Sequence, residues 1–101
     1  MTDDNERVGD ILCCLARLFL QSESHQDAVQ CFEEALSIKK RLLGDCPDVA
    51  ETYHDLGKAY SSMSQNDKAL IFYRESVRIN KKTSNHEALH KVSIDMVRRL
   101  R

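Results

Sequence analysis

The first pattern that could do chemistry lies near the end of the chain, where His86, Glu87 and His90 form the sequence HExxH. In zinc proteases, two histidines one helical turn apart bind the metal, and the glutamate activates a water molecule. Only 11 residues follow His90, and the sole carboxylate among them is Asp95 on the same predicted helix. A third zinc ligand is missing, so we expect no metal, cofactor or catalytic residue and keep a zinc hydrolase as a remote alternative.

The four cysteines are Cys13, Cys14, Cys31 and Cys46, and no two of them have the CxxC spacing of a metal or redox site. On a helix, the adjacent side chains of Cys13 and Cys14 diverge by about 100° and do not easily share a metal. We interpret the cysteines as reduced thiols of a cytoplasmic protein, with a redox role left open. We place Cys14 on an apolar stripe and Cys13 on the polar, ligand-facing side of its helix.

Composition restricts the class of protein. The 101 residues suit one domain, and 42% hydrophobic residues with one Pro and three Gly favour an all-α fold. The net charge of -1 argues against a nucleic-acid partner. The acidic start does not resemble a signal peptide, and the longest apolar run, 11–16, is too short to span a membrane. We therefore expect neither a nucleic-acid nor a membrane partner.

Apolar residues recur at i, i+3, i+4 and i+7, the spacing of a helix buried on one side. Gly44 is suited to end one helix and Pro47 to begin the next, while Ser84 and Glu87 fit a capping box. Short connections make neighbouring helices antiparallel. The pattern predicts five helices in a row of hairpins, over about 7–22, 26–42, 48–63, 66–82 and 85–100.

The row contains an internal repeat. Leu-Ala-x-x-Phe at 15–19 returns as Leu-Gly-x-x-Tyr at 56–60, and Ala-x-x-x-Phe-x-x-Ala at 28–35 returns as Ala-x-x-x-Tyr-x-x-Ser at 69–76. Both motifs are displaced by 41 residues, which indicates a copied structural unit. Small residues allow the helices to approach closely, and the aromatic rings fill the remaining space.

These motifs resemble the tetratricopeptide repeat (TPR). The segment Leu-Gly-Asp-Cys-Pro-Asp-Val-Ala at 43–50 is similar to the connection in long-period repeats of the kinesin light chain and nephrocystin-like type, with Cys46 where those repeats carry His. The resemblance implies a right-handed solenoid of antiparallel helical hairpins, comprising two repeats and a final helix. We expect a flexible segment over 1–6 and a TPR domain over 7–101.

Within that domain, repeat 1 is expected over about 7–42, repeat 2 over about 48–82, and a capping or truncated third repeat over about 85–101. In TPR domains the first helix of each hairpin lines a concave face that holds extended peptides. Asp55 would repel a terminal carboxylate, and we expect no Asn on this face, so a chaperone-tail ligand is disfavoured. The candidate groove residues are Arg17, His54, Asp55, Lys58, His90 and Lys91.

Both ends of the row carry apolar residues outside the core stripes: Ile11, Cys14 and Leu18 at one end, Ile94 and Val97 at the other. We expect these faces to mediate self-association, because terminal helices of a solenoid are normally polar there. Residues 1–50 carry 5 Lys/Arg and 10 Asp/Glu, whereas the remaining residues carry 10 and 6. This charge separation could steer a partner or a second copy.

The sequence therefore predicts a non-enzymatic protein-interaction module, scaffold or adaptor that binds a peptide or helix on its concave face. The alternative is a purely structural segment of a longer TPR array, whose concave face binds nothing.

Overall fold

A computed structural model describes the backbone of residues 2–100 and the side chains of residues 5–98. It contains five helices and, within those residues, no strand, as predicted. The helices are α1 (Thr2–Gln21), α2 (His25–Leu43), α3 (Pro47–Ser62), α4 (Asn66–Lys82) and α5 (His86–Leu100).

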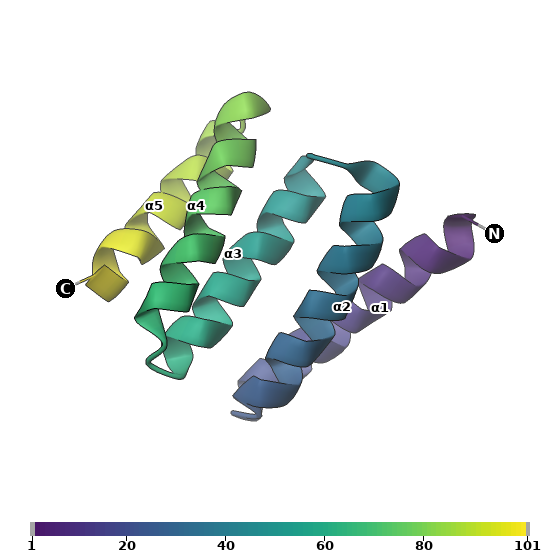
Figure 1. Cartoon of the computed structure of the whole chain (residues 1–101), viewed down its shortest axis with the longest axis horizontal. Helices are drawn as coiled ribbons and strands as arrows, with labels where there is room; N and C mark the ends of the chain where they lie inside the picture. Colours follow the sequence, from purple (N-terminus) through teal and green to yellow (C-terminus); the bar gives the residue numbers. More distant parts are fainter. Residues whose placement is uncertain (1, 101) are drawn as a thin grey trace.

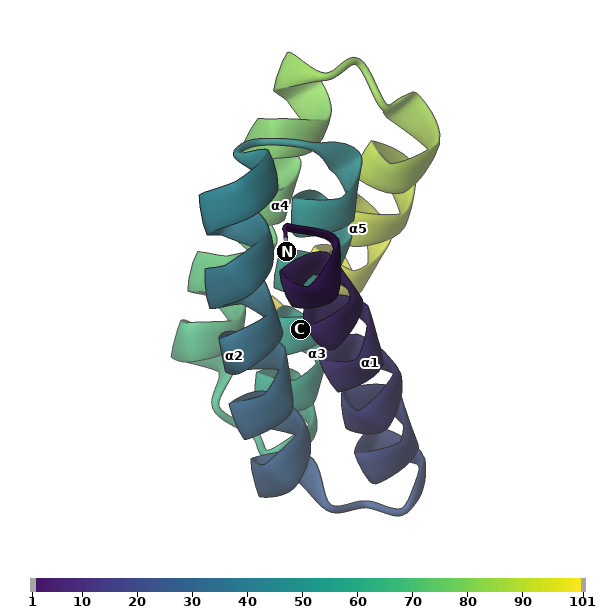
Figure 2. The same ribbon diagram turned by 90° about the vertical axis from the view of Figure 1, so that its right-hand side faces the viewer.

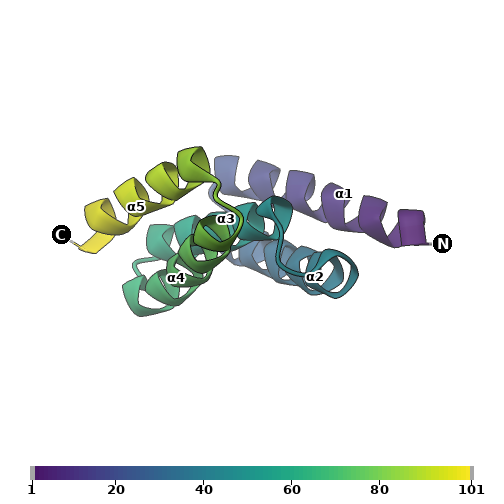
Figure 3. The same ribbon diagram turned by 90° about the horizontal axis from the view of Figure 1, so that it is seen from above.

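The helices form a row of antiparallel hairpins measuring 44 × 33 × 19 Å (Figure 1). Each helix packs against the next one in the chain, and α3 also contacts α5. Seen from above, α1 and α5 lie on either side of α3, while α2 and α4 lie below them (Figure 3). Helix α1 forms one end of the row, with no other described helix on its outer side (Figure 2).

The core is built from rings and large aliphatic side chains packed against alanines. Phe32 and Tyr73, which are equivalent residues of the two repeats, are both buried. Leu56 and Val92 are buried beside them, on α3 and α5. The alanines that allow this packing are Ala16, Ala28, Ala35, Ala59 and Ala69.

The 41-residue repeat also appears in the turns inside the hairpins. Glu23 and Ser64, which are 41 positions apart, both have positive φ, at 63° and 61°. The following N–H groups, of Ser24 and Gln65, donate to carbonyls of the preceding helix at 2.8 and 2.9 Å. These turns could not be predicted from the sequence, because neither residue is a glycine.

The predicted boundary between α2 and α3 is confirmed. Gly44 has φ 66°, and its N–H donates to the carbonyl of Lys40 at 2.9 Å. Pro47 is the first residue of α3, where its missing N–H leaves no helical hydrogen bond unmade.

Two local expectations need correction. Ser84 has φ 56° and does not cap α5; instead Asn85 Oδ1 accepts the N–H of Ala88 at 3.3 Å. Helix α1 begins at Thr2, so residues 2–6 are helical rather than a separate flexible segment, while Met1 lies outside the described residues. The helix passes through Gly9, which lies against the Lys39 side chain: a Cβ at this position would be 3.3 Å from Lys39 Cγ.

Candidate functional site

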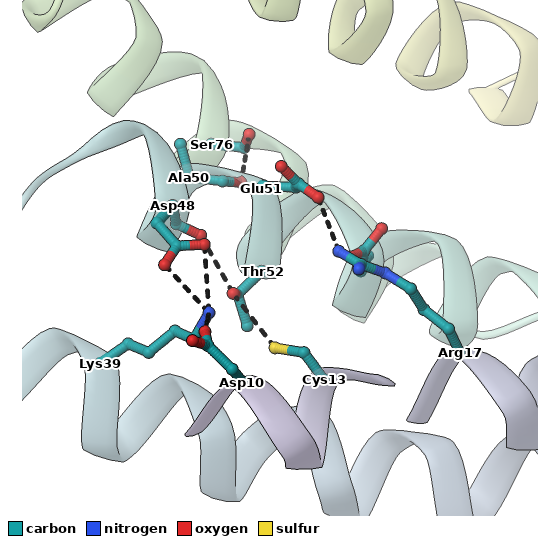
Figure 4. A network of polar contacts seen from close by, with 10 residues as sticks. Asp10, Cys13, Arg17, Lys39, Asp48, Ala50, Glu51, Thr52 and Ser76 are labelled. Carbon is teal, nitrogen blue, oxygen red and sulfur yellow. Dashed lines mark hydrogen bonds and ion pairs between the residues drawn. The ribbon is translucent and has the colours of Figure 1, made fainter. Parts of the chain in front are cut away.

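Arg17 joins α1 to the middle of α3. Its Nη2 lies 2.6 Å from Glu51 Oε1 (Figure 4). The same nitrogen is 3.1 Å from Asp55 Oδ2. Burial raises the pKa of Asp55 above its ordinary value, although Arg17 acts in the opposite direction. Arg17 and Asp55 are therefore partners of each other, and Asp55 does not present a bare carboxylate to solvent.

Lys39 fills the groove between α1 and α3. The side chain comes from α2 and is buried, and its Nζ lies 2.8 Å from Asp10 and 3.0 Å from Asp48 (Figure 4). Burial alone lowers the pKa of Lys39, but the hydrogen bonds with both carboxylates raise it by more than burial lowers it. The pKa of Lys39 is therefore above its ordinary value. The Lys39 ammonium thus bridges α1 and α3.

Cys13 lies in the same contact between α1 and α3, where its Sγ is 3.8 Å from Thr52 Oγ1. The thiol is buried, and this burial raises its pKa. Our placement of Cys13 on the ligand-facing side was therefore wrong, because the helix turns it into the interface with α3. The neighbouring Cys14 is exposed.

A pocket of about 610 Å³ lies between α3, the end of α4 and the start of α5. His54 crosses from α3 to α5, where its Nε2 is 2.6 Å from Asp95 Oδ2. Asn80, on α4, is 1% exposed, and its Oδ1 has no hydrogen-bond partner among the described residues. The lining residues are Pro47, Asp48, Glu51, His54, Asp55, Ser76, Asn80, Asn85, Glu87, Ala88, Lys91 and Val92.

The end of the row at α1 exposes an apolar stripe. Val8, Ile11, Leu15 and Leu18 are 45%, 63%, 41% and 60% exposed, at the 3–4–3 spacing of a coiled-coil seam. Leu15 is the repeat equivalent of Leu56, which is fully buried. The two differ because the α1–α2 hairpin covers Leu56, whereas no described hairpin precedes α1.

The opposite end exposes a smaller apolar surface on α5. Ile94 and Val97 are 39% and 53% exposed, and they line a shallow hollow with His90, Ser93 and Arg98. Val92, two positions from His90, faces the core, and two positions correspond to about 200° around a helix. The expectation that His90 faces the groove is therefore wrong.

A sequence model of the tetratricopeptide repeat matches residues 7–82, three quarters of the chain. The chain belongs to the tetratricopeptide repeat family. It is also 39% identical over 66 residues to Protein HGV2 of Halocynthia roretzi. That alignment covers 64% of this chain and 13% of the relative, so the chain spans only a small part of the relative's length.

TPR repeats generally mediate protein–protein interactions or scaffolding and are typically non-enzymatic. The similarity to kinesin light chain-type repeats stays a prediction. Among the described residues, no group of three or more His, Cys, Asp or Glu side chains could hold a metal, and His86, Glu87 and His90 form no such group. No described helix is long and apolar enough to cross a bilayer.

The TPR architecture places four of the six predicted groove residues around α3. His54, Asp55 and Lys91 line the pocket, and Arg17 reaches Asp55 from the α1 side. Lys58 is exposed on α3 but does not line the pocket. A binding role for these residues stays a prediction.

Two asparagines line the pocket, although we expected no Asn on this face. Asn85 lies in the connection before α5, and Asn80 lies on the second helix of a hairpin, whereas we expected the first helix of each hairpin to line the groove. The internal repeat contains a feature that singles out the position of Asn80. Its equivalent 41 positions earlier is Lys39, an unexpected residue for a buried position.

Proposed function

We propose that the chain is a non-enzymatic interaction module that binds a peptide segment of another protein along the face formed by α1, α3 and α5. The pocket beside α3 carries this proposal. Its polar groups come from three helices and one connection, so they can meet the backbone and side chains of an extended segment at several points.

A selection from a displayed random peptide library tests this function. We expect the purified chain to enrich peptides whose binding is weakened by Glu87→Ala/Lys91→Ala, because both exposed residues line the pocket. The double variant Glu34→Ala/Arg74→Ala removes one charge of each sign from α2 and α4 outside the pocket and serves as the control. Failure to enrich any peptide, or equal losses in both double variants, would contradict the proposal.

We further propose that a second copy of the chain covers the apolar stripe of α1 with the apolar surface of α5. Two features support this pairing. Both surfaces are apolar, and the half of the chain that contains α1 is acidic whereas the half that contains α5 is basic. Because the paired surfaces differ, the association is head-to-tail. Complementary charge predicts that added salt weakens it.

Sedimentation velocity tests this association. Ile11→Asp/Leu18→Asp removes one surface and Ile94→Asp/Val97→Asp removes the other, so we expect each variant alone to be monomeric. Each variant keeps one intact surface, and these two surfaces are complementary, so a mixture of the two variants should form a dimer. A monomeric parent chain, as expected for a segment whose ends are covered within a longer array, would refute the proposal, and so would a mixture that stays monomeric.

We also propose that the protein works in the cytoplasm. All four cysteines are free thiols, and burial raises the pKa of Cys13 and Cys31, which disfavours their reactive thiolates. Fluorescence microscopy of a tagged full-length protein tests the location, and a signal confined to the secretory pathway would contradict it.

A further inference from the structure

The two grooves between the hairpins are built alike but contain different side chains. In the first groove, between α1 and α3, the buried position on the second helix of the hairpin is Lys39. In the second groove, between α3 and α5, the equivalent position 41 residues later is Asn80, which lines the pocket. The first groove therefore holds a lysine of the chain itself where the second groove has a pocket.

The hydrogen bonds of Ser76 fix the orientation of the Asn80 side chain. Ser76 donates its only hydroxyl proton to the carbonyl of Ala50 at 2.8 Å, so it can only accept from Asn80. The amide Nδ2 of Asn80 makes that bond, at 3.4 Å. The amide oxygen Oδ1 is then left as a buried acceptor with no described partner, an arrangement that favours a ligand with a hydrogen-bond donor.

The carboxylates that hold Lys39 in the first groove have counterparts in the second. Glu51 lies 41 positions after Asp10. Glu87 is the second residue of α5, as Asp48 is the second residue of α3. The side chains of Glu51 and Glu87 are 60% and 84% exposed, so both can reach a ligand that enters from solvent.

The charge of the pocket favours a cation over an anion. Four carboxylates line it, from Asp48, Glu51, Asp55 and Glu87, against the single ammonium of Lys91. Arg17 pairs with Glu51 and Asp55, Lys39 with Asp48, and Lys91 with Glu87, so the four carboxylates outnumber their three cationic partners. The start of α5 does not offer an anion site, because the Asn85 side chain caps it and a Glu occupies its first turn.

We propose that this pocket binds a lysine side chain of a partner protein, with its ammonium between Glu51 and Glu87 and one of its protons donated to Asn80 Oδ1. This assignment rests on the proposed peptide-binding function and names its ligand. In this arrangement two carboxylates hold the ammonium, as Asp10 and Asp48 hold Lys39. Acetylation of the partner lysine removes the charge and disrupts binding.

Fluorescence anisotropy with two probes tests the assignment: a fluorescein-labelled peptide of alternating glycine and lysine, and the same peptide with every lysine acetylated. We expect the acetylated probe to bind at least about tenfold more weakly. Nitrogen-15 NMR spectra follow the side-chain amide of Asn80, which should shift with the unmodified probe.

Two variants locate the site. Asn80→Lys supplies the pocket with an ammonium from the chain itself, as in the first groove, and should weaken the unmodified probe by at least about tenfold through like-charge repulsion. Glu87→Gln should weaken it about two- to fivefold, and Glu34→Gln, with the same charge change on α2, should not. Circular dichroism checks that the variants are folded. If Asn80→Lys is unfolded, the comparison of Glu87→Gln with Glu34→Gln tests the assignment, because both residues are exposed.

Equal binding of the two probes would overturn the lysine assignment and leave peptide binding by this face intact. Equal effects of Glu87→Gln and Glu34→Gln, or no binding of either probe, would also overturn it. The library selection described above decides separately whether the face binds peptides of another composition.

Discussion

Gly57 on α3 lies directly against the ring of Tyr73 on α4. A Cβ atom at residue 57 would be 2.6 Å from both Cδ1 and Cε1 of that ring, a distance shorter than any van der Waals contact. The ring is 1% exposed and fixed by its neighbours, so it cannot move aside without disturbing the core. The absence of a side chain at residue 57 therefore sets the distance between α3 and α4.

Gly57→Ala should destabilise the fold by about 1–3 kcal/mol, since the added methyl overpacks the contact with Tyr73. Urea unfolding followed by circular dichroism measures this change. Gly9→Ala is the matched control on α1: its Cβ would lie 3.3 Å from Cγ of the Lys39 side chain. We expect the control to change stability by less than about 1 kcal/mol, because a better helix propensity offsets the tighter contact. Equal destabilisation by both variants would contradict the role given to Tyr73.

Leu15 and Leu56 occupy the same position in successive repeats but differ in environment, at 41% and 0% exposed. Leu56→Ala should cost about 2–5 kcal/mol because it leaves a cavity between two hairpins. Leu15→Ala should cost below about 1 kcal/mol in the monomer, because half of the side chain is already in water. Thermal unfolding at a protein concentration too low for self-association measures both, and similar losses would show that something covers Leu15.

Lys39 links three helices through Asp10 and Asp48. Lys39→Ala should destabilise the fold by about 2–3 kcal/mol, less than for a fully buried ion pair because water can hydrate the half-exposed carboxylates. Lys39→Met keeps the aliphatic packing against Gly9 and should lose only about 1 kcal/mol. If urea unfolding showed the same loss of stability for Lys39→Met and Lys39→Ala, packing of the aliphatic part of Lys39 would contribute nothing to stability.

The same lysine predicts a dependence on alkaline pH. Its pKa is raised in the folded state, so its contribution is complete below the ordinary value of 10.5 and is lost as pH rises through the folded value. The difference in unfolding free energy between the wild type and Lys39→Met should therefore narrow as the pH rises above 10.5. A difference that stays constant from neutral to strongly alkaline pH would contradict the ion pairs.

Two aspartates should respond to acid in opposite directions. Burial raises the pKa of Asp55, so the folded state takes up a proton first, and this group stabilises the fold increasingly as pH falls toward 3.8. Hydrogen bonding by Arg78 lowers the pKa of Asp45, so its contribution is present above 3.8 and is lost as pH falls below it. Urea unfolding across acidic pH, with Asp55→Asn and Asp45→Asn as references, should give slopes of opposite sign.

Much of the fold followed from local sequence patterns. The apolar spacing predicted five helices, and Gly44 with Pro47 placed one boundary correctly, because both residues act through their own backbone geometry. The positive φ at Glu23 and Ser64 could not be predicted in this way. The packing of the hairpin imposes that conformation on residues that do not favour it.

The binding face was harder to predict because it depends on which helices approach each other. We predicted His54 and Asp55 of α3 from the register of the repeat, yet missed Asn80 by assuming that only the first helix of a hairpin reaches the groove. His90 was misplaced because the rotation of α5 is set by the burial of Val92, which a repeat of weak similarity does not reveal.

The exchange of Lys39 for Asn80 between otherwise equivalent positions has a consequence for any extended segment on this face. A segment that binds through a lysine, as we propose, would be held in one register, because one hairpin away that lysine would meet the ammonium of Lys39, which Asp10 and Asp48 already hold. Although the backbone repeats, the side chains at residues 39 and 80 differ, so the proposed ligand could bind in only one register.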